Sequence, residues 1–168
     1  MTGSFIGLRL WRERIAADRH HAEWTQRDGA TQIASAFAVR TLLALLVEAR
    51  PARALEVGAG IGTMTAILVE RCGRVCAVEE NEWCRAQLAA NVPSDRLVAP
   101  EGPAVVVDLA VDLAVVDGDQ LPAWLVRRAI RPHGWLMVEG NRRDWRGSFQ
   151  SACEAVGRRF VVVNLRPF

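Results

Sequence analysis

The sequence predicts an α/β fold of the Rossmann-like, doubly wound kind, with a mostly parallel sheet and helices on both faces. Short apolar runs alternate along the chain with segments whose apolar residues recur at helical spacing. Residues 113–116 and 135–138 are continuously apolar, which is typical of parallel strands buried on both faces. The first predicted strand also runs directly into a glycine-rich turn, as it does in folds of this kind.

The chain begins with two predicted helices. Residues 5–24 form a polar, arginine-rich segment, and Gly29 ends a short connection after it. Residues 31–49 are expected to form a second helix, which Pro51 ends. The predicted apolar face of that helix consists of Ile33, Phe37, Leu42, Leu45 and Leu46.

Strands and helices then alternate to the end of the chain. Gly73 is the expected cap of the first helix in this part. We expect strands at residues 53–57, 74–78, 95–99, 111–116, 134–138 and 159–165. We expect helices at residues 63–71, 82–90, 123–130 and 145–156.

Length and composition fit a single domain over residues 1–168, with a helical N-terminal cover (1–50) and an α/β core (51–168). The net charge of +2 does not by itself predict nucleic-acid binding. All 21 basic residues are arginines, and the chain has neither lysine nor tyrosine. Neither residue type of this chain can therefore serve as a catalytic base.

The cysteines Cys72, Cys76, Cys84 and Cys153 fit no standard zinc spacing, so free thiols in a reducing compartment are expected. Arginines interrupt the early apolar run, and the longest apolar stretch contains Arg40 and Glu48. We therefore expect a cytoplasmic protein with no secretory signal and no membrane span.

A glycine-rich turn, Gly58-x-Gly60-x-Gly62, follows the first predicted strand. Glycines let the backbone turn tightly and let a ligand approach closely. The dinucleotide fingerprint would need a further glycine at Thr63 or Thr65, so neither register completes it. The carboxylate of Glu56 also suits a cationic ligand better than a pyrophosphate.

Acidic residues follow the second predicted strand. Glu79 and Glu80 lie about 20 residues after the glycine turn, where an acid can accept both ribose hydroxyls of a nucleoside. The turn and the acid together predict a nucleoside-containing ligand at the carboxyl ends of the strands.

Residues 55–91 resemble the cofactor half of class I S-adenosylmethionine-dependent methyltransferases. The E-x-G-x-G-x-G loop of that family is complete in Glu56, Gly58, Gly60 and Gly62. The resemblance implies S-adenosylmethionine as cofactor and S-adenosylhomocysteine as product. The cofactor contacts that it implies are Glu56, Gly58, Ala59, Gly60, Gly62, Thr63, Glu79, Glu80, Glu101, Gly102 and Asp117.

The fourth predicted strand ends in Asp117-Gly118-Asp119-Gln120, which resembles the D-A-D-K segment of small metal-dependent O-methyltransferases. That resemblance makes Asp117 the metal acid and puts Gln120 in the place of a lysine base, although glutamine cannot take a proton. Asp117, Glu139 and Asn141 have oxygen ligands suited to Mg²⁺. Our preferred interpretation is that Asp117 and Glu139 line the cofactor pocket without binding a metal ion. It therefore assigns no metal ligand.

The candidate catalytic residues are Asp117, Asp119 and His21. His20 and His21 lie on the N-terminal segment, which often covers the substrate in such folds, and histidine is the commonest general base. Methyl transfer does not require a strong base, because the sulfonium is a good leaving group and in-line positioning of the nucleophile can supply much of the acceleration.

The resemblance implies methyl transfer to a small molecule, at oxygen. A nucleic-acid methyltransferase is an alternative that the clusters Arg127, Arg128, Arg131 and Arg142, Arg143, Arg146 permit and the acidic segment 117–119 opposes. A non-catalytic cofactor-binding or partner module is a second alternative. One strand-like run follows the fifth strand's helix, so we expect the family's final antiparallel strand to be absent. A homodimer through the exposed edge strand would bury it.

Overall fold

The computed structural model describes residues 3–100, 109–117, 126, 128–139 and 159–163. They contain one six-stranded sheet in the order β3-β2-β1-β4-β5-β6, with every neighbouring pair parallel. The strands are β1 (Arg53–Val57), β2 (Arg74–Val78), β3 (Leu97–Val98), β4 (Val111–Val116), β5 (Ile130–Glu139) and β6 (Arg159–Val163). This is the doubly wound order, and its switch point lies between β1 and β4. The predicted fold class is confirmed.

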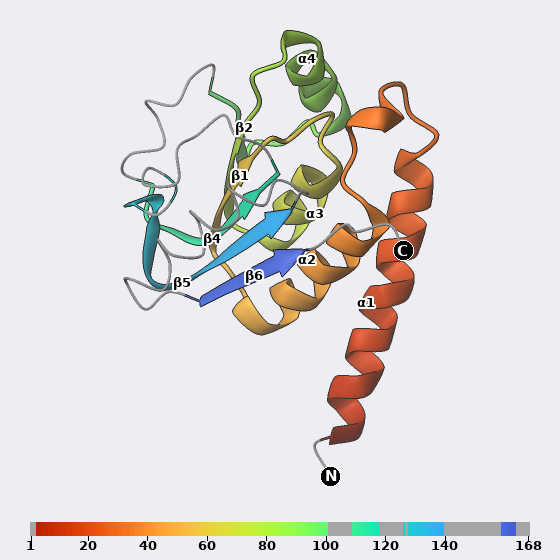
Figure 1. Cartoon of the computed structure of the whole chain (residues 1–168), viewed down its shortest axis with the longest axis vertical. Helices are drawn as coiled ribbons and strands as arrows, with labels where there is room; N and C mark the ends of the chain where they lie inside the picture. Colours follow the sequence, from red (N-terminus) through yellow and green to blue (C-terminus); the bar gives the residue numbers. More distant parts are fainter. Residues whose placement is uncertain (1–2, 101–108, 118–125, 127, 140–158, 164–168) are drawn as a thin grey trace.

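The first four α-helices lie on one face of the sheet (Figure 1). They are α1 (Gly3–Trp24), α2 (Ala36–Ala49), α3 (Thr63–Arg71) and α4 (Glu82–Asn91), and the short 3₁₀ helix η1 (Ala30–Gln32) connects α1 with α2. Leu42 and Leu68 pack on this face against Val75, Leu113 and Met137. Helix α1 lies along the outside of α2, so the N-terminal segment is packed on the core (Figure 1).

The opposite face of the sheet has its own apolar cluster. Leu55, Cys76 and Val138 pack there with Val126 and Ala129, two residues in helical conformation. Side chains alternate between the two faces along each strand, so both faces of this sheet carry apolar side chains. Helical residues cover both faces.

The second predicted helix begins later than expected. Residues 30–32 form η1, and Ser35 then caps α2 by accepting a hydrogen bond from the Ala38 N–H at 3.0 Å. Serine side chains compete for backbone N–H groups in this way and favour helix starts. The prediction for Phe37 is wrong: this side chain is 51% exposed, beside a groove between α1 and α2 that Leu10 and Arg14 also line.

Strand β5 is longer than predicted. Ile130, expected at the end of a helix, pairs with Val111, and the register shifts before Leu113 pairs with Trp135. At such an irregularity the strand contains extra residues that break the regular alternation of side chains between the two faces. A sequence pattern therefore does not reveal the full length of the strand. Strand β3 is shorter than residues 95–99, and the helix expected at 145–156 lies outside the described residues.

Strand β6 pairs directly with β5, in parallel, at the end of the described sheet. Within the described residues, no antiparallel strand lies between them or beyond β6. Among the same residues, no helix combines the length and apolar character needed to cross a membrane.

Candidate functional site

A cleft of about 310 Å³ lies at the carboxyl ends of β1, β2 and β4, where open parallel sheets bind ligands. Polar residues and glycines from these strand ends form one side of it, and the connection between α1 and α2 forms the other. Its described lining consists of Thr31, Gln32, Ile33, Gly58, Gly60, Glu79, Glu80, Asn81 and Asp117. The sequence-predicted Gly58, Gly60, Glu79, Glu80 and Asp117 therefore share one cleft.

The glycine loop has a backbone that requires glycine. Gly60 has φ +55°, and a Cβ atom there would lie 2.2 Å from the backbone oxygen of Gln32. Gly62 has φ +105°, and its Cβ would lie 2.8 Å from Val92 Cγ2. L-residues rarely adopt this left-handed region, and no real Cβ tolerates such contacts. The loop is thus held closely between the N-terminal segment and α4.

All five amide groups from Gly58 to Gly62 donate hydrogen bonds within the chain. Gly58 and Ala59 donate to the Val78 oxygen at 2.9 and 3.3 Å, Gly60 to Glu79 Oε2 at 2.8 Å, Ile61 to the Gln32 oxygen at 3.5 Å, and Gly62 to the Ala59 oxygen at 3.0 Å. Phosphate-binding loops instead point free N–H groups at their ligand. The loop is therefore poorly suited to a pyrophosphate.

Glu79, at the end of β2, is 8% exposed and lies on the cleft. Its Oε2 accepts the Gly60 N–H, and its Oε1 accepts the Asn81 N–H, both at 2.8 Å. Each carboxylate oxygen has two acceptor positions, so one on each oxygen is left for ligand hydroxyls. This geometry suits the two adjacent hydroxyls of a ribose.

Glu56, in β1, lies beneath the loop and is 1% exposed. Thr65 Oγ1 donates to its Oε2 at 2.6 Å. Burial raises the pKa of Glu56 to about 8; the hydrogen bond from Thr65 opposes this rise, and the charges of Asp117, Glu79 and Glu139 add to it. A cation at the loop would favour the ionised form.

Glu139 ends β5 and is 1% exposed. Its Oε1 accepts the hydroxyl of Ser35 at 2.8 Å and the Ser35 N–H at 3.3 Å, and its Oε2 has no hydrogen-bond partner among the described residues. Burial raises the pKa of Glu139, and the two bonds from Ser35 counteract this. Glu139 thus connects the amino end of α2 to the sheet and does not line the cleft.

Asp117 follows β4, and its N–H donates to the Val57 oxygen at 2.8 Å. This backbone contact holds the residue beside β1, and Asp117 lines the cleft. Its role at a reaction centre stays a prediction.

Four predicted cofactor contacts, Glu56, Ala59, Gly62 and Thr63, are not among the lining residues of the cleft. The side chains of Glu56, Ala59 and Thr63 are buried. His21 does not line it either. Its neighbour His20 instead lies against the start of α3, with Nε2 2.8 Å from the Thr63 oxygen. The role of His21 stays a prediction.

Several predicted site residues lie outside the described residues. They are Glu101, Gly102, Asp119, Gln120 and Asn141. Within the described part of the chain, no group of three or more His, Cys, Asp or Glu side chains could hold a metal ion. The three described cysteines, Cys72, Cys76 and Cys84, are free and buried.

The sequence-based reasoning missed the residues that the N-terminal segment contributes. Thr31, Gln32 and Ile33 line the cleft, and Ser35 holds Glu139. Ser35 has a recognisable signal, because serine is a preferred helix cap. Gln32 contacts the loop through its backbone oxygen, which no side-chain pattern reveals.

Comparison with known proteins gives matches in structure. No protein-family model matches the sequence, and no curated protein matches it. A presumptive O-methyltransferase from Klebsiella pneumoniae is 23% identical, with a TM-score of 0.57 over 84% of this chain and 77% of that one. A tRNA methyltransferase from Aquifex aeolicus is 17% identical, with a TM-score of 0.60 over 74% and 54%.

A third similar structure is the precorrin-8w decarboxylase of Methanobacterium thermoautotrophicum. It is 22% identical, with a TM-score of 0.59 over 70% of each chain. At these identities the likeness concerns the fold, and the strand order and the glycine loop agree with it. The chain has the class I fold of S-adenosylmethionine-dependent methyltransferases.

Proposed function

We propose that the chain binds S-adenosylmethionine in this cleft and transfers its methyl group to a small molecule, at an oxygen atom. The observation that carries the proposal is the contact between Glu79 and the glycine loop. Each oxygen of Glu79 keeps one acceptor position for a ribose hydroxyl. Every amide N–H from Gly58 to Gly62 is already hydrogen-bonded within the chain. A nucleoside without phosphates fits this arrangement.

The charge of the cleft supports the same ligand. Glu79, Glu80 and Asp117 line it, and the described lining contains no arginine or histidine. S-adenosylmethionine has a cationic sulfonium and a cationic amino group, which this environment stabilises. Glu79 would hold the ribose, and Gly58 and Gly60 would permit close approach of the ligand.

The sulfonium supplies an electrophilic methyl group. In the transfer, the acceptor oxygen forms a bond to the methyl carbon, the sulfur–methyl bond breaks, and S-adenosylhomocysteine leaves. The hydroxyl proton of the acceptor passes to a base, for which Asp117 at the cleft is our first choice and Asp119 and His21 are the others. Alignment of the acceptor supplies much of the acceleration.

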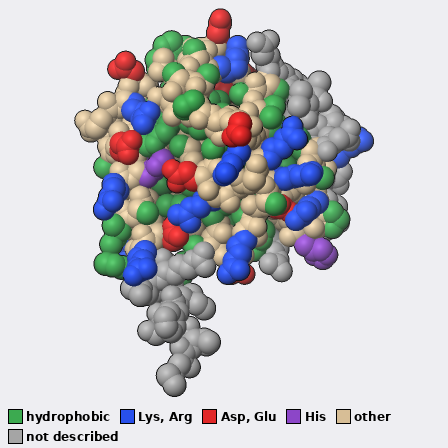
Figure 2. Space-filling model, turned by 180° about the vertical axis from the view of Figure 1, so that it is seen from behind, with side chains coloured by type: hydrophobic (Ala, Val, Ile, Leu, Met, Phe, Trp, Pro, Cys, Tyr) green, Lys and Arg blue, Asp and Glu red, His purple; other side chains and the backbone are tan. Residues whose placement is uncertain are grey.

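A nucleic-acid acceptor is the second candidate, because one of the similar structures is a tRNA methyltransferase. The acidic lining of the cleft opposes it, since Glu80 and Asp117 would repel a phosphate backbone. Figure 2 shows acidic side chains among the arginines on the face opposite to that of Figure 1. Among the described ion pairs, Arg71 pairs with Glu13 at 3.0 Å.

Calorimetry with S-adenosylmethionine tests the proposal. We expect the wild type to bind it and Glu79→Ala to bind it much more weakly. A wild type that does not bind would sink the methyltransferase proposals for both acceptor classes, and equal binding by Glu79→Ala would sink the ribose assignment. Titration with added Mg²⁺ tests whether a cation assists, which our assignment does not require.

An acceptor screen then distinguishes an enzyme from a non-catalytic module. S-adenosylhomocysteine release is measured with phenols, hydroxy acids, amines and short RNAs. Release with a hydroxyl compound supports the proposal, and release with RNA supports the second candidate. Binding without release across the whole panel favours a cofactor-binding module.

We further propose a homodimer through the edge strand β6 and a cytoplasmic location. The described sheet ends at β6, and a parallel edge is a ready template for another strand. Light scattering at micromolar concentration tests the dimer, and a monomer would exclude it.

A further inference from the structure

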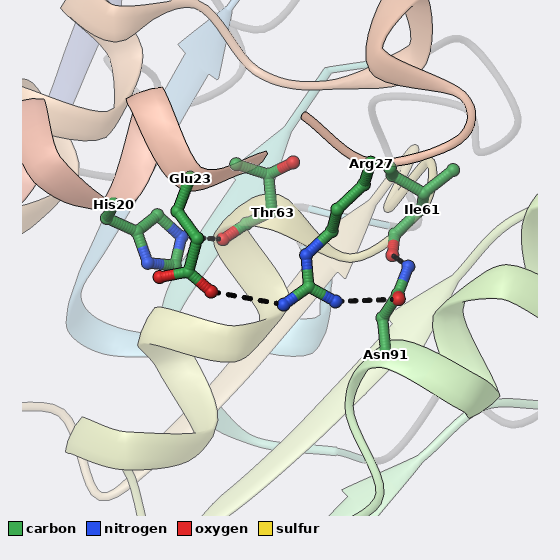
Figure 3. Close-up of polar contacts among 6 residues, drawn as sticks. All are labelled: His20, Glu23, Arg27, Ile61, Thr63 and Asn91. Atoms are coloured by element: carbon green, nitrogen blue, oxygen red, sulfur yellow. Dashed lines mark hydrogen bonds and ion pairs between the residues drawn. The ribbon is translucent and has the colours of Figure 1, made fainter. Parts of the chain in front are cut away.

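Three side chains connect the outside of the glycine loop to elements that the cleft does not include (Figure 3). His20 Nε2 lies 2.8 Å from the Thr63 oxygen. Arg27 Nη1 donates to Asn91 Oδ1 at 2.7 Å, and Asn91 Nδ2 donates to the Ile61 oxygen at 3.1 Å. None of these three side chains is among the lining residues of the cleft.

Asn91 uses both ends of its amide group. As the last residue of α4, it accepts from the segment after α1 and donates to the loop. If Arg27 moves away, the Asn91 amide loses the acceptor contact that fixes its orientation. The Ile61 oxygen then loses an oriented donor.

Arg27 is itself held in place. Its Nη2 contacts Glu23 Oε1 at 3.2 Å, and its guanidinium lies 4.3 Å from the centre of the Trp24 ring. Trp24 is 2% exposed and reaches the side of the loop, 3.5 Å from the Cβ position of Gly62. A planar guanidinium over an aromatic ring is a favourable and directional arrangement.

We propose that Arg27 and Asn91 are positioning residues for the cofactor, a relay that fixes the Ile61–Gly62 peptide from the N-terminal segment. The inference rests on the proposed binding of S-adenosylmethionine. A loop with three glycines has many conformations to lose, so a loop already fixed by the relay binds at a smaller entropic cost. Cofactor affinity therefore depends on docking of residues 20–32, although Arg27 and Asn91 do not contact the ligand.

The experiment compares three variants with a matched control. Asn91→Asp keeps the acceptor for Arg27 and removes the donor to Ile61, Asn91→Ala removes both, and Arg27→Ala removes the outer contact. Gln87→Ala is the control, because Gln87 lies one turn earlier on α4 and its side chain makes no hydrogen bond among the described residues. Thermal melts establish that each variant folds.

Two measurements follow on each variant. Calorimetry gives the affinity for S-adenosylmethionine, and hydrogen exchange without ligand gives the protection of amides 58–63. We expect Asn91→Asp and Asn91→Ala to bind about three- to tenfold more weakly, the range for loss of one hydrogen bond. Both should exchange faster over 58–63, and Gln87→Ala should match the wild type in affinity and exchange.

A double-mutant cycle tests the relay itself. If Arg27 acts through Asn91, the losses in the Arg27→Ala/Asn91→Ala pair are less than additive, whereas additive losses overturn the relay. Wild-type affinity and protection in Asn91→Asp, with the Arg27 contact retained, also overturn it. If the wild type binds no S-adenosylmethionine, the proposed function fails, and unchanged exchange in both Asn91 variants separately refutes positioning of the loop.

Discussion

Glu79 accepts a hydrogen bond from the N–H of Gly60, so the acid at the end of β2 and the middle of the glycine loop form one unit. Two features that the sequence places 19 residues apart are 2.8 Å apart in the fold. The contact has a consequence for mutation, because a change at Glu79 alters both the proposed ribose acceptor and the support of the loop.

We expect Glu79→Ala to weaken S-adenosylmethionine binding by about 10- to 100-fold, the range for losing a hydrogen bond to a charged group. Calorimetry measures this, with Glu80→Ala as control, because Glu80 lines the same cleft but is exposed. Glu79→Gln should lie between wild type and Glu79→Ala, since it keeps one oxygen. Equal losses for Glu79→Ala and Glu80→Ala would indicate only a general charge effect.

Gly60→Ala should abolish cofactor binding and lower the free energy of unfolding by about 1 to 3 kcal/mol, from the left-handed backbone and the collision with the Gln32 oxygen. Gly73→Ala is the control, because its Cβ would lie 3.3 Å from the Ala52 oxygen and its φ is not in the positive range. Urea denaturation and calorimetry provide the comparison. A Gly60→Ala protein that binds S-adenosylmethionine as well as Gly73→Ala does would contradict the close contact between Gly60 and the Gln32 oxygen.

The pKa of Glu56, raised from 4.5 to about 8 mainly by burial, predicts a pH dependence of stability. Between these values the folded chain holds a proton that the unfolded chain has released. The contribution of Glu56 is therefore fully present below about pH 4.5 and is lost as the pH rises through about 8. Glu56→Gln should remove this part of the pH slope, as urea denaturation at several pH values would reveal. An unchanged slope would contradict it.

The same group should release a proton when a cation binds. S-adenosylmethionine brings positive charge to the loop, which lowers the pKa of Glu56 and favours its ionised form. Calorimetry at neutral pH in two buffers with different ionisation enthalpies measures the released fraction. Glu56→Gln should release less, and identical heats in both buffers for the wild type would rule the linkage out.

Ser35→Ala should destabilise the fold by about 2 to 4 kcal/mol, because it removes a helix cap and one of the hydrogen bonds to a buried carboxyl. Ser35 Oγ accepts from Ala38 and donates to Glu139. Ser35→Thr keeps the hydroxyl and should cost much less. Chemical denaturation gives both values, and a loss below about 0.5 kcal/mol would mean that Glu139 is satisfied by other groups.

The sheet and the glycine-loop side of the cleft were predictable because they depend on local patterns. Apolar runs located β1, β2 and β4, and the glycines and Glu79 follow directly from the ends of two of those strands. The start of β5 was not predictable in this way. Pro132 and Gly134 are typical of a turn, yet the strand begins before them and continues past a register shift.

The N-terminal contribution depends on long-range contacts. His20, 43 residues from Thr63, faces the loop while His21 does not line the cleft. The phase of α1 explains the difference, since His20 shares a side of the helix with the buried Ala17 and Trp24. Only the packed helix identifies that side, because polar and apolar residues are mixed along α1.

The three strands on one side of the switch point, β1 to β3, are synthesised before the three on the other side, β4 to β6. Residues up to 98 contain β1 to β3 and α1 to α4. They include the contacts of Glu79 and Asn91 with the glycine loop and of His20 with the start of α3. The glycine-loop side of the cleft is therefore synthesised before Asp117. The other face of these three strands, with Leu55, Val57 and Cys76, then has no helix to cover it. That apolar face stays uncovered until the later part of the chain has been made.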